Sequence, residues 1–187
     1  NNLIDDIFLE KKKNSNNTFF ALSSKITGET IGSKLNRLTN ILKKSKIDNL
    51  FISAPENVAW LLNIRGSDNP NSPIPNSRII VTKNKKIYLF TNLNNVKKIK
   101  NLNLYKNINY YDYNNFVNVL IKLNGNSFCI DKITCSIFFE SLIKSKYKIK
   151  KHDDPCYILK SIKNNLEINN MKKAHIEDGV ALTKFLY

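Results

Sequence analysis

The sequence predicts an α/β layer fold, because short apolar runs typical of strands alternate with segments of helical periodicity along most of the chain. Two of these runs flank a polar turn at residues 83–85 and predict a β-hairpin. A hydrophobic share of 42% in 187 residues is enough to form a core, which argues against wholesale disorder. The length suits one ordinary domain with flanking pieces.

The segment before the fold predicts a connection rather than part of a sheet. The stretch NLIDDIF at 2–8 has the pattern of the tail of an upstream domain, and residues 10–28 are polar with one short apolar knot, which is typical of a linker. Because the chain begins with Asn rather than Met, we expect it to be a piece of a longer protein. We assign residues 1–27 to this tail and linker, 28–163 to the α/β domain, and 164–187 to the first helix of a further domain.

Helical periodicity begins after Thr30, and the run at 49–53 then predicts a buried strand. Ser53 is a candidate N-cap for a short helix that ends near Leu62, because Pro55 falls in its first turn, where a missing N–H costs little. The first helix places its apolar side chains on one face at Ile31, Leu35, Leu38, Ile41 and Leu42.

The rest of the chain continues the alternation. Asp154 is placed to cap a helix that Pro155 opens. From Val180 the last helix is almost wholly apolar, which requires a partner surface, so we expect a C-terminal domain to follow. The predicted strands are 77–82, 86–91, 107–111, 127–131 and 147–151, and the predicted helices are 93–100, 114–123, 135–145, 155–161 and 165–187.

The formal net charge of +15 invites a nucleic-acid partner, since clustered Lys and Arg release counterions from phosphate. Composition explains the charge more simply, because Asn is as frequent as Lys and Arg together and the Lys residues are scattered over every predicted element. AT-rich codons produce this pattern. The basic surface therefore does not establish a nucleic-acid partner. No membrane partner is predicted either, because no run approaches the roughly 20 apolar residues of a membrane-spanning helix.

The chain holds few residues suited to catalysis or metal binding. Cys129, Cys135 and Cys156 lack CxxC spacing, which indicates neither a disulfide framework nor a zinc site and favours a reducing, cytoplasmic compartment. His175 and Asp178 lie three apart on one helix, but metal sites need three or four ligands, so a hydrogen bond on the helix surface is favoured.

Two further groups have open interpretations. His152 could act as a base beside two Asp residues, although a place at the border of the helix cap is favoured. Asp131 ends a predicted strand, where α/β proteins often place functional carboxylates, but it could equally cap the next helix. We predict no catalytic residue and no metal ligand in this chain.

The stretch NVAWLLNIRGSDNPNSPIPNSRII at 57–80 holds the only Trp, two of the three Arg and three of the five Pro of the chain. Its prolines and Gly66 describe a stiff loop with a guanidinium at its root. Arg65 can make bidentate contacts to a carboxylate. A pair with Asp68 would hold the shape of the loop itself, while a free Arg65 would face a ligand or a partner domain. Trp60, Arg65 and Asp68 are therefore the candidate substrate-binding or interface residues.

Four blocks together resemble the Xaa-Pro aminopeptidases of the creatinase/prolidase clan. They are NLID at 2–5, TGETIGSKLNRL at 27–38, AWLLNIRGSD at 59–68 and ILKSIKNNLEINNMKKAHIEDGVALTKFLY at 158–187. They cover nearly the whole chain in the family's order, so the combination is specific although each block alone is modest.

The resemblance implies the second, non-catalytic domain of such an enzyme, with a mixed sheet flanked by helices and a ribonuclease H-like motif. It implies a downstream catalytic domain with two metal ions, usually manganese, held by two Asp, one His and two Glu, none of them in this chain. Such enzymes remove the N-terminal residue from peptides with proline in second position, and a homodimer is expected. The family pattern also implies a structural role for His175 in the entry helix of that catalytic domain.

Three alternatives remain open. The chain could come from a prolidase- or creatinase-like enzyme, from a catalytically inactive clan member such as a histone chaperone subunit, or from a basic nucleic-acid-binding module. The ligand set downstream of Tyr187 would discriminate among the clan members. Salt-dependent retention on nucleic acid would discriminate the last.

Overall fold

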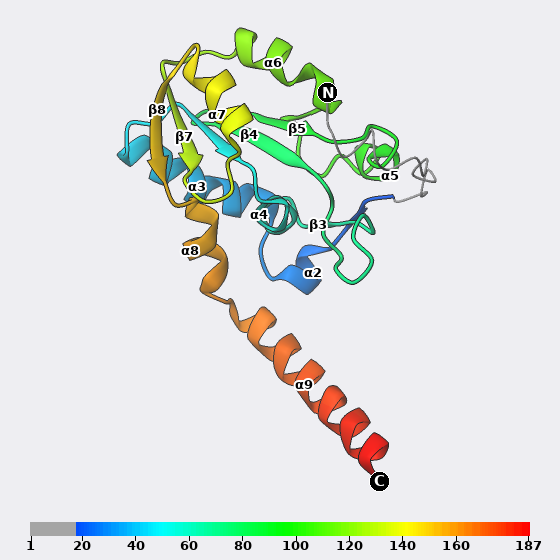
Figure 1. Cartoon of the computed structure of the whole chain (residues 1–187). Coiled ribbons are helices and arrows are strands. Elements are labelled where there is room, and N and C mark those ends of the chain that lie inside the picture. The colour runs from blue at the N-terminus through cyan, green and yellow to red at the C-terminus, as the bar shows by residue number, and fades with distance from the viewer. Residues whose placement is uncertain (1–17) are drawn as a thin grey trace.

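The computed structural model describes residues 18–187 and has a six-stranded mixed sheet at its centre (Figure 1). Its strand order is β6-β5-β4-β2-β7-β8, with antiparallel pairs on both sides of β4 and parallel pairs elsewhere. This confirms the predicted α/β class and the hairpin of β4 and β5. The strands are β2 Asn49–Ile52, β4 Arg78–Thr82, β5 Ile87–Phe90, β6 Ile108–Tyr111, β7 Ser127–Asp131 and β8 Lys148–His152.

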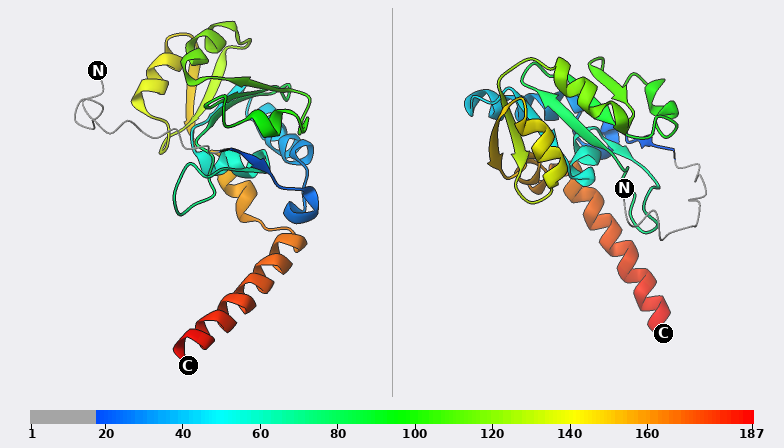
Figure 2. Two further views of the ribbon diagram at one scale, coloured as in Figure 1. Left: turned by 90° about the vertical axis from the view of Figure 1, so that its right-hand side faces the viewer. Right: turned by 45° about the horizontal axis from the view of Figure 1, so that its top comes forward.

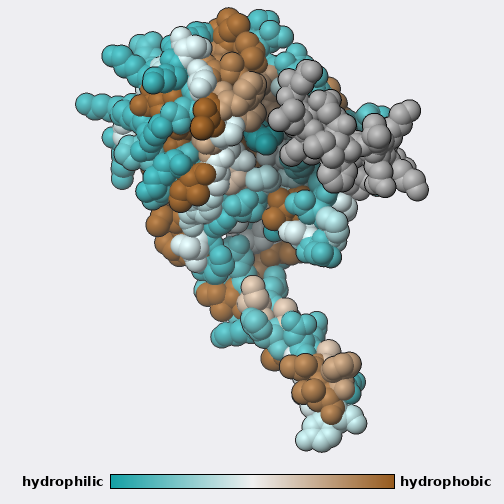
Figure 3. Space-filling model, viewed as in Figure 1, coloured by the Kyte–Doolittle hydropathy of each residue, from teal (hydrophilic) through white to brown (hydrophobic). Residues whose placement is uncertain are grey.

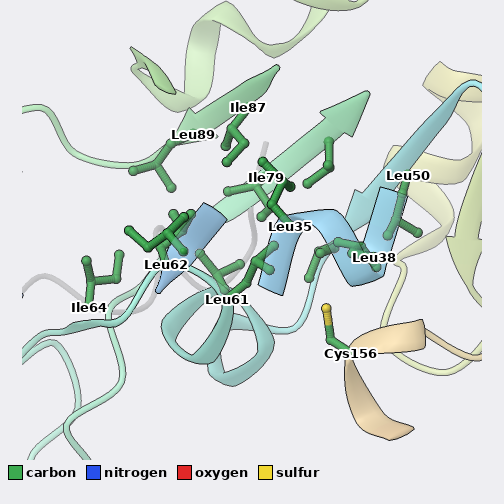
Figure 4. Close-up of a cluster of buried hydrophobic side chains, with 14 of the residues drawn as sticks. Leu35, Leu38, Leu50, Leu61, Leu62, Ile64, Ile79, Ile87, Leu89 and Cys156 are labelled. Carbon is green, nitrogen blue, oxygen red and sulfur yellow. The ribbon is translucent and has the colours of Figure 1, made fainter. Parts of the chain in front are cut away.

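Helices cover both faces of this sheet (Figures 1 and 2). Side chains alternate between the faces along each strand, so Leu50 and Ile52 belong to one buried cluster while Phe51 belongs to the other. The cluster around Leu50 is drawn in Figure 4, with Leu35 and Leu38 packed beneath the strands. That face is covered by α3 Ile31–Lys44, α4 Pro55–Leu61 and α8 Pro155–Ser161, and the other by α6 Phe116–Lys122 and α7 Ile137–Lys144.

Two predicted helix starts have different outcomes. Asp154 caps α8 as predicted, since its carboxylate accepts a hydrogen bond from the Cys156 N–H at 2.9 Å. The prediction for Ser53 is wrong, because Ala54 occupies the N-cap position of α4 and makes no side-chain cap. Ser53 Oγ instead shares a hydrogen bond with Thr134 Oγ1 at 2.7 Å, so its hydroxyl joins β2 to the turn after β7.

One segment is less regular than predicted and another is more ordered. The helix expected at 93–100 is reduced to α5 Lys97–Lys100, preceded by turns that still bury Val96. Residues 18–28, expected to be linker, contain β1 Phe20–Ala21 and α2 Ser24–Thr27, and β1 pairs antiparallel with β3 Ile64–Arg65. Local composition does not show this order, because it depends on pairing with a segment over 40 residues away. The earlier part of the expected linker and the NLIDDIF stretch lie outside the described residues.

The last helix, α9 Asn165–Leu186, projects away from the sheet domain (Figures 1 and 2). None of its residues is buried. Its apolar side chains gather near the free end, as Figure 3 shows in brown, and Phe185 is 84% exposed. Residues 18–187 contain no helix that is both long enough and apolar enough to cross a membrane.

Candidate functional site

The corner between α4 and β3 is built around the side chain of Asn63. This residue has a φ of 50°, a left-handed conformation that Asn tolerates better than most residues, and it is 5% exposed. Its Oδ1 accepts a hydrogen bond from Lys34 Nζ at 2.6 Å, and its Nδ2 donates to the Glu29 carbonyl at 2.9 Å. One amide therefore joins the end of α4 to α3 and to the segment that precedes α3.

Lys34 is a buried cation in this corner. It is 2% exposed, and its ammonium donates a second hydrogen bond to the Trp60 carbonyl at 2.8 Å and lies 4.5 Å from the centre of the Trp60 ring. Burial lowers the pKa of Lys34 to about 8, although the negative charge of Glu29 opposes this shift. The sequence analysis missed Lys34. Its spacing from Ile31 and Leu38 places it on the apolar face of α3, and that was the available signal.

Trp60 belongs to the same cluster. Its partly exposed ring packs against the core and has the Arg37 guanidinium 5.8 Å from its centre. Arg37 in turn forms a two-point pair with Glu29, at 3.0 Å and 2.5 Å. The guanidinium and the buried ammonium of Lys34 both favour the electron-rich ring, so Trp60 helps to offset the burial of positive charge.

Arg65 does not form the pair with Asp68 that we considered. Its Nη1 donates to the carbonyls of Ala59 at 3.3 Å and Ile64 at 2.9 Å, and among residues 18–187 it has no ion pair. The Asp68 carboxylate instead accepts from the Asn76 N–H at 2.5 Å and from Asn95 Nδ2 at 3.1 Å. Asp68 therefore fixes the loop, while Arg65 anchors the corner and keeps part of its guanidinium available.

The loop after Arg65 is held tightly against the sheet domain. The Gly66 N–H donates to the Pro73 carbonyl at 3.2 Å, and a Cβ on Gly66 would lie 2.9 Å from Pro75 Cα. The Asn76 carbonyl accepts from Thr91 and from the Tyr113 hydroxyl, which ties the end of the loop to the sheet. Glycine permits this close approach, so the start of the loop is packed against its end.

The same corner receives the start of α9. Asn164 caps α9 in a reciprocal capping box with Glu167, and its Nδ2 also donates to the Thr27 carbonyl of α2 at 2.9 Å. Two turns later, Asn170 Nδ2 donates to the Ile26 carbonyl at 3.2 Å. α9 is therefore attached to α2, which the sequence predicted to be linker.

A groove of about 550 Å³ lies between α2 and α9, and Arg65 is part of its wall. Its lining is mainly apolar, and Ile26 and Met171, on opposite walls, are each more than half exposed. His175 also lines this groove, and the described part of the chain places no cluster of potential metal ligands around it. Of the three candidate residues, the structure brings Arg65 to the groove, Trp60 to the corner behind it, and Asp68 to the loop.

Asp131 and His152, whose interpretation the sequence left open, make contacts within the fold. Asp131 accepts hydrogen bonds from Thr134 and from the Asp154 N–H at 3.1 Å, and Ser136 rather than Asp131 caps α7. His152 is the last residue of β8, and its carbonyl accepts from the Lys132 N–H at 3.3 Å. Within residues 18–187, no three His, Cys, Asp or Glu side chains are placed to hold a metal ion. The resemblance implies two metal ions in a downstream domain, and residues 18–187 provide no set of ligands for them.

Comparison with known proteins gives consistent relatives. The family model described as creatinase/prolidase N-terminal domain matches residues 10–167. Xaa-Pro aminopeptidase 1 of Dictyostelium discoideum is 31% identical over 172 residues, which cover 91% of this chain and 27% of the relative. Xaa-Pro aminopeptidase ApepP of Drosophila melanogaster is 30% identical and is matched over 98% of this chain and 31% of the relative. The chain thus spans less than a third of the length of these relatives.

Solved structures share the fold. The X-prolyl aminopeptidase of Caenorhabditis elegans, described as a cytosolic enzyme with a di-nuclear active site, superposes over 100% of this chain and 31% of its own, with a TM-score of 0.87 and 24% identity. The prolidase of Pyrococcus furiosus superposes over 78% of this chain and 41% of its own, with a TM-score of 0.53 and 24% identity.

The buried ammonium of Lys34 gives the corner a defined pH dependence. The folded protein releases this proton near pH 8 and the unfolded chain near 10.5, so the unfolded state holds more protons between these values. The free energy of unfolding should therefore rise with pH in this window. Relative to Lys34→Met, the wild type should gain about 2 kcal/mol between about pH 7 and about pH 9.5. Denaturant unfolding at several pH values measures this difference.

Lys44→Met is the matched control, because Lys44 is an exposed lysine on the same helix. Its free energy of unfolding should follow the wild-type pH dependence. Parallel curves for the wild type and Lys34→Met would show that Lys34 keeps an ordinary pKa.

Proposed function

The chain belongs to the creatinase/prolidase N-terminal domain family, and on that premise we propose that it is the non-catalytic domain of an Xaa-Pro aminopeptidase. The match over residues 10–167 carries this proposal, because the relatives that share it at about 30% identity are Xaa-Pro aminopeptidases several times longer than this chain. In the longer protein, residues 164–187 would be the first helix of the catalytic domain. The exposed apolar end of α9 supports this, since such a surface is costly to leave in water.

The proposed parent enzyme removes the N-terminal residue from peptides whose second residue is proline. Two divalent ions, which we expect to be manganese, would supply the hydrolytic chemistry in the catalytic domain. The di-nuclear site described for the C. elegans enzyme supports this expectation. We also propose a cytoplasmic homodimer, in keeping with the free thiols of this chain and with the cytosolic location described for that neighbour.

Within such an enzyme, this domain would shape the substrate cleft or a subunit interface. Arg65 is the residue that we propose to face it, because it lines the groove beside α9 and its hydrogen bonds to the Ala59 and Ile64 carbonyls both come from Nη1. Trp60 and Asp68 would act behind Arg65, by fixing the corner and the loop respectively. Several residues of α9 line the groove, and in the longer protein these residues would belong to the following domain.

The first experiment compares this chain with the longer natural polypeptide. We expect Mn²⁺-dependent release of the N-terminal residue from an Xaa-Pro peptide by the longer form and no release by this chain. Release by neither form would favour a prolidase-like or inactive member of the clan. Release by this chain alone, surviving repurification, would contradict the assignment of catalysis to another domain.

Replacing Arg65 tests its role in the longer polypeptide. Arg65→Ala should raise KM for the Xaa-Pro peptide by roughly threefold or more, or shift the dimer toward monomer, because the groove loses its guanidinium. Arg65→Lys keeps the charge but loses the planar guanidinium, so its KM and its dimer stability should lie between those of the wild type and Arg65→Ala. Steady-state kinetics and analytical ultracentrifugation measure the two effects.

Lys25→Ala is the matched control, since Lys25 is an exposed cation on α2 and does not line the groove. If KM and assembly were the same in Arg65→Ala and Lys25→Ala, Arg65 would only support the local turn.

A further inference from the structure

Hydrogen bonds between α9 and α2 are placed so that they can fix the orientation of α9 relative to the sheet domain. We propose that Gly28, Asn164 and Asn170 form a latch that fixes the angle at which α9 leaves the sheet domain. Insofar as it concerns the position of a catalytic domain, this inference rests on the proposed function. In that context the three are positioning residues.

Two hydrogen bonds at different positions along the axis of α9 define the latch. The last carbonyls of a helix have no partner within it, and at the end of α2 those of Thr27 and Ile26 are taken by the amides of Asn164 and Asn170. The two Asn residues are separated by about 9 Å along α9, at 1.5 Å per residue. A single contact would leave α9 free to pivot, whereas two contacts at this separation fix its direction.

Asn164 does more than a helix cap requires. Its Oδ1 accepts from the Glu167 N–H at 2.9 Å, and this is the cap that Ser, Thr or Asp would also provide. Its Nδ2 makes the separate bond to the Thr27 carbonyl, which needs a hydrogen-bond donor. The two functions can therefore be separated by substitution, because Asp keeps the acceptor and lacks the donor.

Gly28 provides the space that Asn164 occupies. It has a φ of 72° and ends α2 in the left-handed conformation, with its N–H bonded to the Ser24 carbonyl. A Cβ at this position would lie 2.3 Å from Asn164 Oδ1, so any side chain would displace the Asn164 amide. Gly28 is thus required twice, for the turn and for the docking of α9.

The latch is connected to the sheet domain through the corner already described. The Asn63 carbonyl accepts from the Leu22 N–H at 2.7 Å, while its side chain holds the Glu29 carbonyl, so both ends of the α2 segment are fixed. No residue of α9 is buried, so the packing that holds its direction is limited to side chains that stay partly exposed. Within residues 18–187, these hydrogen bonds connect α9 through α2 to Asn63 and so fix its orientation relative to the sheet.

The test uses a latch variant and a charge-matched control. Asn164→Asp with Asn170→Ala removes both donors while keeping the cap. Asn165→Asp with Asn169→Ala makes the same two changes at the neighbouring positions, which are exposed. Spin labels at Asn84→Cys and Lys184→Cys report the direction of α9 relative to the sheet. Cys135→Ser removes the one cysteine that is not buried.

Electron–electron double resonance on this chain then gives the label distance. We expect one narrow distribution for the wild type and the control, and a distribution roughly twice as wide for the latch variant. Gly28→Ala should broaden it similarly. Helix content by circular dichroism should be equal in the latch and control variants, which shows that α9 is still formed. Equal widths in all variants would overturn the latch.

Activity of the longer polypeptide tests the consequence separately. The latch variant should lose roughly tenfold in kcat/KM for the Xaa-Pro peptide, while the control keeps the wild-type value. An inactive wild-type polypeptide would refute the proposed function, and the distance measurement would still decide the latch. Wild-type activity in a latch variant with broadened distances would refute the positioning role.

Discussion

The buried amide of Asn63 is the interaction on which the arrangement of this corner depends. It joins the Lys34 ammonium on α3 to the Glu29 carbonyl, and its own carbonyl holds the Leu22 N–H. Leu22, Glu29 and Lys34, all far from Asn63 in sequence, therefore meet at this one residue, the last two through its side chain and Leu22 through its main-chain carbonyl. A buried amide with both of its polar atoms paired is stabilising, whereas each atom left unpaired would cost about 1–3 kcal/mol. The corner is thus sensitive to the loss of any partner.

Charge burial explains why so many partners surround this amide. Lys34 is almost inaccessible to water, and its first partners are carbonyl oxygens and the face of Trp60 rather than a carboxylate. Glu29 compensates from a distance and is itself held by Arg37. Several weak terms together therefore offset one desolvation cost. These residues lie in the blocks that resemble Xaa-Pro aminopeptidases. Part of the sequence resemblance therefore corresponds to residues that build this corner.

The sequence predicted the alternation of strands and helices because that pattern depends on local periodicity. It could not predict the order of α2, whose stability depends on the pairing of β1 with β3 and on Asn63. Of the three candidate residues, Arg65 lies at the groove and Trp60 in the corner, while Asp68, considered as a partner of Arg65, binds Asn76 and Asn95 instead. Side-chain partners within a loop depend on its three-dimensional path, which composition and spacing do not specify.

Hydrogen exchange of an Asn63→Gly variant tests most directly whether this amide supports the joint. Glycine accepts the positive φ of this position, so the substitution removes only the side chain. Our account predicts faster exchange at residues 24–30 and 164–170, with exchange in β2 and β4 unchanged. Asn103→Gly, an exposed Asn with a φ of 44°, is the control and should leave both segments unchanged. Unchanged exchange at 24–30 and 164–170 in Asn63→Gly would contradict the account.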